Sequence, residues 1–440
     1  MIMSIIQKYT NKDITVGIVG LGYVGLPLSK AFCDKDIKVV GFDIDKSKIE
    51  SLNNGNSYIK HIPDDVIKRI NNDGLFNSTS DFSKISDVDA IIICVPTPLT
   101  KANEPDLEPV LSTGETISKY LKKGQLVVLE SSTYPGTTNE ELSPILEASG
   151  LKNGEDFYLA YSPEREDPGS EDYTTSTIPK IVGADDKNAI NLATLLYKNV
   201  IDKVIVVGSI RVAEATKLTE NIFRSVNIAL VNELKIIYDA MGIDVWEVIE
   251  GASTKPFGYM PFFPGPGLGG HCIPIDPFYL SYKAKEYGVP TKFIELAGEI
   301  NTKMPEYVIS KLKESLSTFS KIDIKESKIL VIGAAYKKNV DDMRESPSLV
   351  LIRSLLNFNA EVDYYDPFVP IIPPSREYNE LTGMKGIKLL SKTINTYDAV
   401  IISTDHDCID YKLIGEHANL IIDTRNAMKF HKSKAKIIKA

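Results

Sequence analysis

The sequence predicts an α/β fold with two doubly wound parallel sheets, joined by a helical domain that contains one long central helix. Short apolar runs alternate with amphipathic stretches in the first half of the chain and again after Lys328, which is the pattern of βαβ units. Between these regions, the segment from about Arg211 to Met241 contains no Gly or Pro and repeats its apolar residues at helical spacing. The length of 440 residues exceeds what one hydrophobic core supports, so two or three domains are expected.

The first α/β region is expected to begin with a strand, a glycine-rich turn and a helix. Further short apolar runs come later along the chain, separated by amphipathic stretches. This alternation predicts a parallel sheet. The predicted strands lie at 14–19, 38–43, 90–95, 126–130 and 157–161, and the first helix lies at 26–33.

The uninterrupted segment Arg211–Met241 is predicted to form a single helix. About 30 residues at ~1.5 Å per residue give a length on the order of 45 Å, which is long for an element inside one domain. Such a helix is a candidate connector between domains and a candidate dimer surface. The later segment Pro256–Pro277 is dense in Gly and Pro, so it is predicted to be an ordered, functional loop without regular structure.

A second α/β unit begins at Lys328 and echoes the first, with strands expected at 329–333, 362–365, 399–403 and 420–422. The turn at Gly333 lacks the glycine fingerprint of the first unit, so only the first is expected to bind a dinucleotide. We therefore predict a Rossmann domain at 1–207, a helical dimerisation domain with the cysteine loop at 208–322, and a second Rossmann-like domain at 323–440.

Composition and charge narrow the classes of function. The chain is 43% hydrophobic and 25% charged, as in globular proteins, and its net charge is −9. An acidic chain has no basic field to recruit nucleic acid or an anionic membrane surface, so neither is an expected partner. No apolar run reaches the ~18–20 residues of a membrane span, and the N-terminus lacks a signal-peptide pattern. A cytoplasmic protein is expected.

The four cysteines are Cys33, Cys94, Cys272 and Cys408. They are far apart and form no Cys-x-x-Cys pair, so neither a metal site nor a disulfide framework is indicated. Three of them lie in apolar runs and are expected to be small core residues. Cys272 differs, because it lies in the loop dense in Gly and Pro.

A glycine fingerprint follows the first predicted strand and opens the first helix. Gly20 allows the tight turn, Gly22 lets the backbone approach a pyrophosphate, and Gly25 lets helix and strand pack closely. Asp43 follows the second strand, where a carboxylate accepts hydrogen bonds from ribose hydroxyls and repels a 2′-phosphate. A glycine-rich turn without a ligand is the alternative. Because strand, helix and acid are all in place, we predict NAD as the cofactor rather than NADP.

Cys272 is a candidate nucleophile. Glycines precede it, and Asp276 follows four residues later, close enough to activate water. A thiol near a cation or a run of backbone N–H groups loses its proton more easily and attacks electrophiles. A buried structural cysteine explains the local sequence equally well. The adjacent His271 is expected to shape the loop rather than to catalyse.

Four further residues are candidates by position. Lys217 and Asn221 are spaced i, i+4 on the long helix, where an ammonium and an amide would stabilise an oxyanion. Spacing alone favours an ordinary solvated helix face. Thr133 and Glu164 each follow a predicted strand, at the sheet edge where ligands bind. A loop residue or a helix cap is the alternative for both.

Taken together, these motifs resemble the UDP-glucose/GDP-mannose dehydrogenase family over nearly the whole chain, from Val16 to about Asn426. The resemblance implies an NAD-binding first domain, a dimerising helical middle and a nucleotide-sugar domain at the end. It implies a four-electron oxidation at C6 through a thiohemiacetal and a thioester on Cys272. The motifs are the glycine fingerprint with Asp43, Ser132-Thr133-x-Pro135, Ser162-Pro163-Glu164, Lys217-Leu218-x-x-Asn221, Gly269-Gly270-x-Cys272-x-Pro274-x-Asp276, and Tyr336-Lys337-Lys338-x-x-x-Asp342-x-Arg344-Glu345-Ser346.

The resemblance also implies roles for individual residues. Lys217 and Asn221 would hold the C6 oxygen, Asp276 and Thr133 would position water, and Glu164 would assist hydrolysis with Cys272 as nucleophile. The cofactor would contact Gly20, Gly22, Tyr23, Val24, Gly25, Asp43, Thr97, Thr133 and Arg344. The nucleotide sugar would contact Glu164, Arg165, Lys217, Asn221, Gly269, Tyr336, Lys337 and Arg425.

The sequence around the motifs is similar to that of the family branch that acts on UDP-N-acetylhexosamines. Tyr58–Ile62, Ser162–Arg165 and Pro264–His271 carry this similarity. Within the branch the chain is most similar to UDP-N-acetylglucosamine 6-dehydrogenases of surface-polysaccharide synthesis, including O-antigen. UDP-N-acetylgalactosamine, UDP-N-acetylmannosamine and UDP-glucose stay open, because a few hydrogen bonds discriminate epimers. A homodimer or higher oligomer is expected.

Two other classes of function fit the motifs less well. A two-electron hydroxy-acid dehydrogenase would need the glycine fingerprint but no nucleophilic thiol, so Cys272 and the second Rossmann-like domain would be unexplained. A non-catalytic binding protein would not need both Lys217 and Cys272.

Overall fold

The computed structural model describes residues 2–59, 62–100, 102, 104–165, 176–270, 273–375 and 377–440. These residues form two compact units. The first contains 1–220 and 278–290, and the second contains 221–277 and 291–440. The predicted division into three domains after residues 207 and 322 stays a prediction.

The central strand of the first sheet is β1 (Thr15–Val19). It pairs in parallel with β2 (Lys38–Phe42) on one side and with β4 (Ala90–Ile93) on the other, so the strand order reverses here. Sheets of this topology bind ligands beyond the carboxyl ends of the strands at such a switch point. The order of the described strands is β3-β2-β1-β4-β5-β6-β7-β8, with β3 at Phe76–Thr79, β5 at Leu126–Leu129, β6 at Tyr158–Tyr161, β7 at Lys180–Ala184 and β8 at Val204–Val207.

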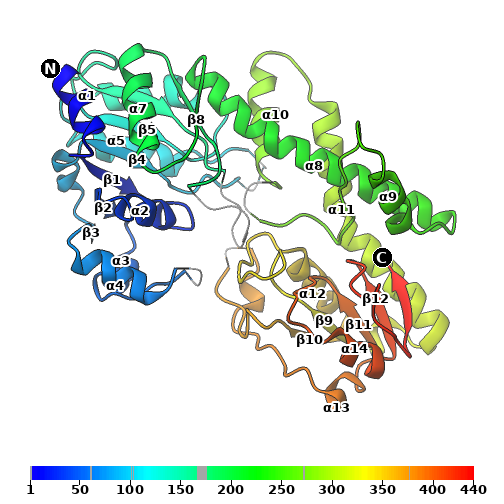
Figure 1. Ribbon diagram of the computed structural model, residues 1–440. Helices are drawn as coiled ribbons and strands as arrows, with labels where there is room; N and C mark the ends of the chain where they lie inside the picture. Colours follow the sequence, from blue (N-terminus) through cyan, green and yellow to red (C-terminus); the bar gives the residue numbers. More distant parts are fainter. Residues whose placement is uncertain are drawn as a thin grey trace. The chain divides into compact units, whose positions relative to one another are not determined.

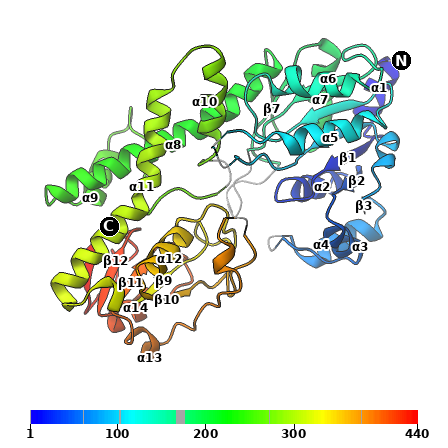
Figure 2. The same ribbon diagram turned by 180° about the vertical axis from the view of Figure 1, so that it is seen from behind.

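Alternate residues of this sheet face two separate cores. Val16 and Ile18 of β1 lie in one core with residues of α1, α2 and α7, whereas Val19 lies in the other core with residues of α5 and α6 (Figures 1 and 2). Helices therefore cover both faces, which is why the strands are apolar runs rather than alternating ones. The helices are α1 Ile2–Thr10, α2 Gly25–Cys33, α3 Lys46–Asn53, α4 Asp64–Asn72, α5 Glu108–Ser118, α6 Ser143–Glu147 and α7 Lys187–Lys198, with shorter turns η1 Phe82–Asp87 and η2 Thr137–Leu142.

The strands β7 and β8 run opposite to the rest of the first sheet. β7 is antiparallel to β6, with Tyr161 opposite Gly183, and parallel to β8. The α/β class with two such sheets is confirmed, and the predicted strands of the first sheet pair in parallel. The antiparallel pair β6–β7 involves a strand that was not predicted. An antiparallel neighbour needs no crossover helix. The alternation of apolar runs and helices therefore gives no sign of this reversal, and β3, β7 and β8 are absent from the predicted strands.

The predicted long helix is α8 (Ile210–Ala240), which is 31 residues long (Figure 1). It is followed by α9 (Val245–Ser253) and then by the loop dense in Gly and Pro. The described residues of that loop carry no helix or strand up to Ile275, as predicted, but Asp276 and Pro277 already belong to α10 (Asp276–Glu286). An acidic residue followed by Pro favours a helix start, and this explains the difference. The second unit continues with α11 (Lys292–Ser315), η3 (Leu316–Ser320) and η4 (Ile324–Glu326).

The second sheet is parallel throughout its described strands. β9 (Lys328–Ile332) is flanked by β10 (Glu361–Tyr365) and β11 (Ala399–Ile402), so it again marks a switch point. Ile329 and Val331 of β9 face a core shared with α11 and α12, and Leu330 and Ile332 face a core shared with α13 and α14. The remaining elements are α12 Pro347–Asn357, η5 Asn379–Leu381, α13 Ser391–Ile394, α14 Tyr411–His417, β12 Leu420–Asp423 and β13 Lys436–Lys439, of which β13 is absent from the predicted strands.

The structure corrects one expectation about the cysteines. Cys33 is buried and Cys94 is partly buried, but Cys408 is exposed. Cys408 lies in the loop between β11 and α14, beyond the apolar strand residues that suggested a core position. None of the helices in the described ranges is long and apolar enough to cross a membrane.

Candidate active site

The glycine fingerprint forms a tight turn between β1 and α2. Gly20 has φ +94°, and a Cβ atom there would lie 2.6 Å from the carbonyl oxygen of Cys94. A Cβ atom on Gly25 would lie 1.9 Å from the carbonyl oxygen of Gly20. By contrast, no atom of the described residues lies within 4 Å of the position that a Cβ of Gly22 would take. The first and third glycines are required by the fold itself, whereas the second leaves open space beside the backbone.

This turn fits a dinucleotide pyrophosphate. Val24 is the N-cap of α2 and gives no side-chain cap. The N–H of Leu26 donates to the carbonyl of Gly22 at 3.2 Å and Pro27 has no N–H, so a phosphate here would meet the positive end of the helix dipole and the backbone of the turn. Tyr23 is partly buried in the same turn. Thr97 is buried after β4, on the other side of the switch point. The open position at Gly22 is where a backbone approach to the ligand would occur.

Asp43 lies directly after β2, and its buried side chain stabilises the glycine turn through hydrogen bonds. Its carboxylate accepts hydrogen bonds from the backbone N–H of Leu21 (3.0 Å) and of Asp45 (2.9 Å), and it pairs with Lys48 (3.2 Å). The hydroxyl of Tyr58 donates to the carbonyl of Leu21 at 2.5 Å. The carboxylate expected to contact ribose is thus also the group that fixes the glycine turn.

A group of buried charges lies at the carboxyl edge of β5 and β6. Glu130 follows β5, Glu164 follows β6, and Lys180 begins β7. The ammonium nitrogen of Lys180 lies 2.8 Å from Oε2 of Glu130 and 3.0 Å from Oε2 of Glu164. The hydroxyl of Tyr197 donates to Oε1 of Glu130. Burial raises the pKa of Glu130 to about 7 despite its pairing with Lys180. Burial also opposes ionisation of Glu164, but the charge and hydrogen bond of Lys180, together with the charge of Lys217, outweigh it, so the pKa of Glu164 is lowered.

Lys217 of α8 reaches the same edge. Its ammonium donates to the backbone carbonyl of Glu164 at 2.5 Å. Arg165, predicted to contact substrate, bonds to residues of its own unit: its Nε donates to Glu220 of α8 at 3.2 Å and its Nη1 donates to the carbonyl of Pro179 at 2.7 Å. The structure therefore brings Glu164 and Lys217 together, with Arg165 tied to the helix one turn further on.

Thr133 lies after β5 with its side chain completely buried. Its hydroxyl oxygen has no hydrogen-bond partner among the described residues. A buried hydroxyl without a partner is costly, so a ligand or a water is expected to complete it. The loop that follows is held by Glu214 of α8, which accepts hydrogen bonds from the backbone N–H groups of Gly136 (2.6 Å) and Thr138 (2.9 Å).

In the second unit, Asn221 and Asp276 are in direct contact. Both side chains are buried, and the amide nitrogen of Asn221 donates to Oδ2 of Asp276 at 2.6 Å. His271 and Cys272 lie outside the described residues. The glycines before them pack on the loop after β9: a Cβ on Gly269 would lie 2.5 Å from Cβ of Tyr336, and the N–H of Gly270 donates to the carbonyl of Arg344 at 2.9 Å. The space that these glycines leave is thus filled in part by Tyr336.

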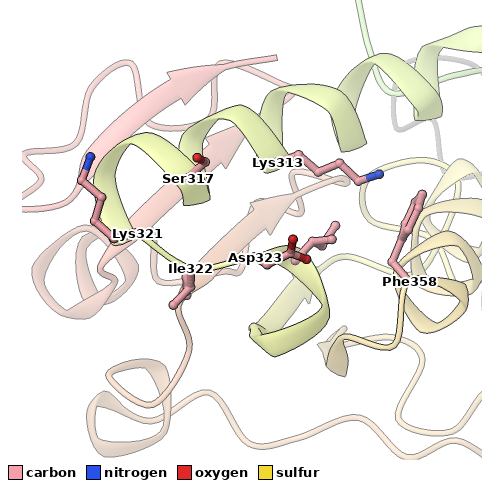
Figure 3. A pocket seen from close by; sticks show the side chains of 7 residues that line it. Lys313, Ser317, Lys321, Ile322, Asp323 and Phe358 are labelled. Atoms are coloured by element: carbon pink, nitrogen blue, oxygen red, sulfur yellow. The ribbon is translucent and has the colours of Figure 1, made fainter.

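The cationic residues predicted to bind nucleotide or cofactor are also placed in the second unit. The guanidinium of Arg344 forms a two-pronged pair with Asp342, Nε to Oδ1 at 3.0 Å and Nη2 to Oδ2 at 2.6 Å. The Nε of Arg425 donates to the carbonyl of Ser403 at 2.9 Å, and its Nη1 lies 2.5 Å from where a Cβ of Gly265 would be. Lys337 is partly buried beside Tyr336. A groove at the end of α11 is separate from these residues; it is lined by Lys313, Ser317, Lys321, Ile322, Asp323, Ile324 and Phe358 (Figure 3).

Three residues of this geometry are absent from the sequence-based candidates. They are Glu130, Lys180 and Glu214, which are far in sequence from the groups that they hold. Asp342 belongs to the motif around Arg344, but no role was predicted for it. A faint signal exists for Glu130, which directly follows the apolar run of β5, and for Glu214, which lies three residues before Lys217 on the long helix. For Lys180 there is no such signal, because its place depends on the direction of β7.

Comparison with known proteins gives a consistent result along the chain. Three domain profiles of the UDP-glucose/GDP-mannose dehydrogenase family match: the NAD binding domain at 14–201, the central domain at 211–303 and the UDP binding domain at 330–430. A UDP-N-acetyl-D-glucosamine 6-dehydrogenase of Pseudomonas aeruginosa is 37% identical, over 92% of this chain and 93% of that protein. A UDP-N-acetyl-D-mannosamine dehydrogenase of Pyrococcus horikoshii is 36% identical over 94% and 96%. The solved structure of a UDP-D-ManNAc dehydrogenase from Pyrococcus horikoshii superimposes with a TM-score of 0.86 at 34% identity, covering 96% of this chain and 98% of the other.

Proposed function

Since the chain belongs to the UDP-glucose/GDP-mannose dehydrogenase family, with NAD as its cofactor, we propose that it oxidises C6 of a UDP-N-acetylhexosamine to the uronic acid. We favour UDP-N-acetyl-D-glucosamine as the substrate. Relatives named for this substrate are 37% and 34% identical, and relatives named for UDP-N-acetyl-D-mannosamine are 34% to 36% identical. The product would serve surface-polysaccharide synthesis. The mannosamine epimer is the second candidate, since these identities overlap.

The contact that carries the proposal is the hydrogen bond from Lys217 to the carbonyl of Glu164. It fixes a buried ammonium beside a carboxylate at the carboxyl edge of the first sheet, which is where a cation and a base would meet an alcohol. Thr133 at the same edge has a buried hydroxyl that requires a partner. A two-electron hydroxy-acid dehydrogenase would leave the UDP binding domain without a use.

The chemistry consumes one alcohol, two NAD and one water, and gives one carboxylate, two NADH and three protons. When bound, NAD accepts a hydride from C6 in each of the two oxidations. Lys217 and Asn221 would stabilise the oxygen on C6 while it loses its proton. The sulfur of Cys272 would attack the aldehyde carbon, and after the second oxidation it would carry the acyl group as a thioester. Water positioned by Thr133 and Asp276 would cleave the thioester, with its proton passing to Glu164.

The contacts within each unit support these roles. Asp276 accepts one N–H of the Asn221 amide at 2.6 Å, which fixes the amide and leaves its second N–H for the substrate oxygen. Asp342 holds the guanidinium of Arg344 in one orientation, so this side chain would meet a phosphate or a cofactor without losing further conformational entropy. Arg425 and Lys337 would supply the positive charge that a diphosphate requires in an acidic chain.

We also propose a homodimer through the face of α8. Phe223, Leu230 and Ile237 are 49%, 51% and 45% exposed, and they repeat every seven residues along one side of the helix. Such an apolar stripe is typical of a helix that packs against a second copy. Light scattering after gel filtration tests this: Leu230→Asp is expected to give monomer where the unaltered protein gives dimer, and an unaltered protein that is monomeric would contradict it.

The catalytic proposal is tested by the endpoint yield of NADH against limiting sugar. UDP-GlcNAc, UDP-ManNAc, UDP-GalNAc and UDP-glucose would be supplied separately with excess NAD. Two NADH per UDP-GlcNAc, with loss of this yield in Cys272→Ala, is the expected result. Two NADH with UDP-ManNAc alone would move the substrate to that epimer. One NADH per sugar would reject the thioester route, and none with any of the four sugars would reject the proposed activity.

A further inference from the structure

The reversal of β7 places a lysine against the carboxylate expected to drive hydrolysis. The antiparallel register pairs Ala160 with Ala184 and Tyr161 with Gly183, so paired residue numbers add up to 344. Continued three residues beyond β6, the same register puts Glu164 opposite Lys180. A parallel β7 would have placed the start of the strand at the opposite edge of the sheet. The juxtaposition of Lys180 and Glu164 therefore results from strand direction.

Both oxygens of the Glu164 carboxylate have defined donors. Oε1 accepts the backbone N–H of Arg165 at 2.7 Å, and Oε2 accepts the ammonium of Lys180 at 3.0 Å. The backbone carbonyl of Glu164 accepts the ammonium of Lys217 at 2.5 Å. These bonds fix the position and the rotation of the carboxylate and favour its charged form.

Lys180 also pairs with a second buried carboxylate, that of Glu130. Its side chain is 6% exposed, and its ammonium lies 2.8 Å from Oε2 of Glu130, which is completely buried and also receives the hydroxyl of Tyr197. A lysine needed only to neutralise one buried carboxylate would need one partner. Here Glu130 and Tyr197 anchor the lysine, and the lysine faces the carboxylate at the ligand edge.

We propose that Lys180 is a positioning residue for thioester hydrolysis: anchored by Glu130, it holds the Glu164 carboxylate ionised and oriented so that Glu164 accepts a proton from the attacking water. In this step the O–H bond of water breaks, the new C–O bond forms, the proton goes to Glu164, and the sulfur of Cys272 leaves with the electrons of the C–S bond. No further redox partner is required. The inference rests on the proposed function and assigns Lys180 no contact with the substrate.

The expected consequences arise from the charge of Lys180. Without it, the pKa of Glu164 rises, because burial then acts on a carboxylate that keeps only the weaker influence of Lys217. The carboxylate is consequently ionised only at higher pH, so the acid limb of the kcat profile moves to higher pH. Oxidation is unaffected, so the thioester accumulates. Lys180→Met is expected to give a burst of about two NADH per site followed by turnover at least about 10-fold slower than that of the unaltered enzyme.

The chain offers a matched control in Lys283. This lysine is in the same unit, its side chain is 7% exposed, and it also pairs with two carboxylates, Glu140 at 3.0 Å and Glu286 at 2.7 Å. Among the described residues, its ion pairs involve neither Glu130 nor Glu164. Its partners Glu140 and Glu286 are 35% and 51% exposed, so Lys283→Met is expected to lose less stability than Lys180→Met. It is expected to show no burst and no shift of the acid limb.

The deciding experiment combines rapid mixing with a direct titration. Enzymes carrying Lys180→Met, Lys180→Arg and Lys283→Met would be mixed with NAD and UDP-GlcNAc, and covalent substrate on Cys272 would be quantified by mass spectrometry after acid quench. Lys180→Arg keeps the charge and is expected to restore much of the hydrolysis rate. Covalent intermediate that does not accumulate in Lys180→Met, or an unchanged acid limb, would overturn the proposal.

A second readout separates this proposal from the proposed function. The carboxyl of Glu164 would be titrated by infrared difference spectroscopy, with its signal assigned by Glu164→Gln, in protein with and without Lys180→Met. A pKa that is the same in both rejects the role of Lys180 whatever the substrate, whereas a shifted pKa in a protein that oxidises no nucleotide sugar rejects the function alone. Should Lys180→Met fail to fold, Lys180→Met with Glu130→Gln removes the second buried charge and carries the same test.

Discussion

At the switch point of each sheet, a glycine turn is held by a carboxylate, but the segments that follow the two turns differ. Gly20 after β1 and Gly333 after β9 have φ of +94° and +84°, and a Cβ on them would lie 2.6 and 2.5 Å from a backbone oxygen of a neighbouring loop. In each unit a carboxylate after the neighbouring strand accepts N–H groups of the turn. Asp43 accepts the N–H of Leu21, and Asp366 accepts those of Ala334 and Ala335 at 2.7 and 2.9 Å.

The segments after the two turns are different. After Gly20 the helix α2 begins within five residues, without a side-chain cap, and the N–H of Leu26 donates to the carbonyl of Gly22 in the turn itself. After Gly333 the helix α12 begins only at Pro347 and is capped by Ser346, whose side chain accepts the N–H of Ser348. The inserted segment carries Tyr336, Lys337 and Arg344. One strand–turn unit therefore offers a helix terminus to a pyrophosphate, and the other offers side chains.

The two carboxylates differ accordingly. The side chain of Asp366 is completely buried and accepts two further N–H groups, from Phe368 and Val369, besides a bond with His406 at 3.0 Å. Nδ1 of His406 accepts the N–H of Asn339, so this imidazole donates to Asp366 from Nε2 and anchors the inserted loop. Asp43 has fewer partners and lies at the ligand edge. The difference indicates that Asp366 serves the loop, whereas Asp43 holds its turn and lies at the edge where the proposed contact with the cofactor would form.

The largest expected effect is a loss of NAD affinity when the turn before α2 is disrupted. In Gly25→Val, the new Cβ atom would lie 1.9 Å from the carbonyl oxygen of Gly20. The turn must therefore move. We expect NAD affinity to fall at least about 100-fold, equivalent to about 3 kcal/mol of overpacking. Isothermal titration with NAD measures this. Gly22→Ala is the control: it should leave the thermal unfolding midpoint unchanged, because its methyl meets open space.

The next effect concerns the loop of the second unit. Each carboxylate oxygen of Asp366 accepts two backbone N–H groups. In Asp366→Asn, the amide N–H₂ replaces one of these oxygens, so two backbone N–H groups lose their acceptor and face another donor. We expect the free energy of unfolding to fall by about 2–4 kcal/mol. Urea unfolding measures the change. NAD binding by the first unit should be retained, and loss of NAD affinity together with this destabilisation would show that the two turns are not independent.

The same carboxyl makes stability depend on pH in acid. Burial raises the pKa of Asp366, but the hydrogen bonds of His406 and of the loop N–H groups outweigh burial, and the pKa is lowered. A lowered folded pKa stabilises the protein above the unfolded value of about 4, and the contribution is lost as the pH falls through the folded value. The stability difference between the unaltered protein and Asp366→Asn should therefore shrink below about pH 4. A difference that is constant down to about pH 2 would contradict this.

The smallest expected effect is a change in the preference for NAD over NADP when Asp43 loses its charge. Asp43→Asn keeps an oxygen for the N–H of Leu21 and loses the hydrogen bond from the part-buried N–H of Asp45, so the turn should stay folded with a smaller loss of stability than in Asp366→Asn. It removes the charge that repels a 2′-phosphate. The preference for NAD over NADP is expected to narrow by about 10-fold, or about 1.4 kcal/mol. The ratio of the two dissociation constants measures it. An unchanged ratio would assign Asp43 to the turn alone.

The amino-acid sequence by itself predicted the elements and many of the candidate residues. The spacing of Gly20, Gly22 and Gly25 identifies a strand, turn and helix, because each glycine answers a local steric demand. The absence of Gly and Pro from Arg211 to Met241 gives the long helix α8 for the same local reason. Thr133, Glu164 and Lys217 could be proposed because residues after strands or on one helix face have positions that the sequence spacing specifies.

Only the tertiary structure decided which groups support these residues. Lys180 lies beside Glu164 because β7 runs antiparallel to β6, and Glu214 holds the Thr133 loop from a helix 76 to 78 residues away. Cys408 is exposed, although His406 and Ile409 in the same loop are buried. Periodicity is a property of neighbouring residues and survives in the sequence. Strand direction and the partners of a buried charge depend on pairing between distant segments, where many arrangements share the same local pattern.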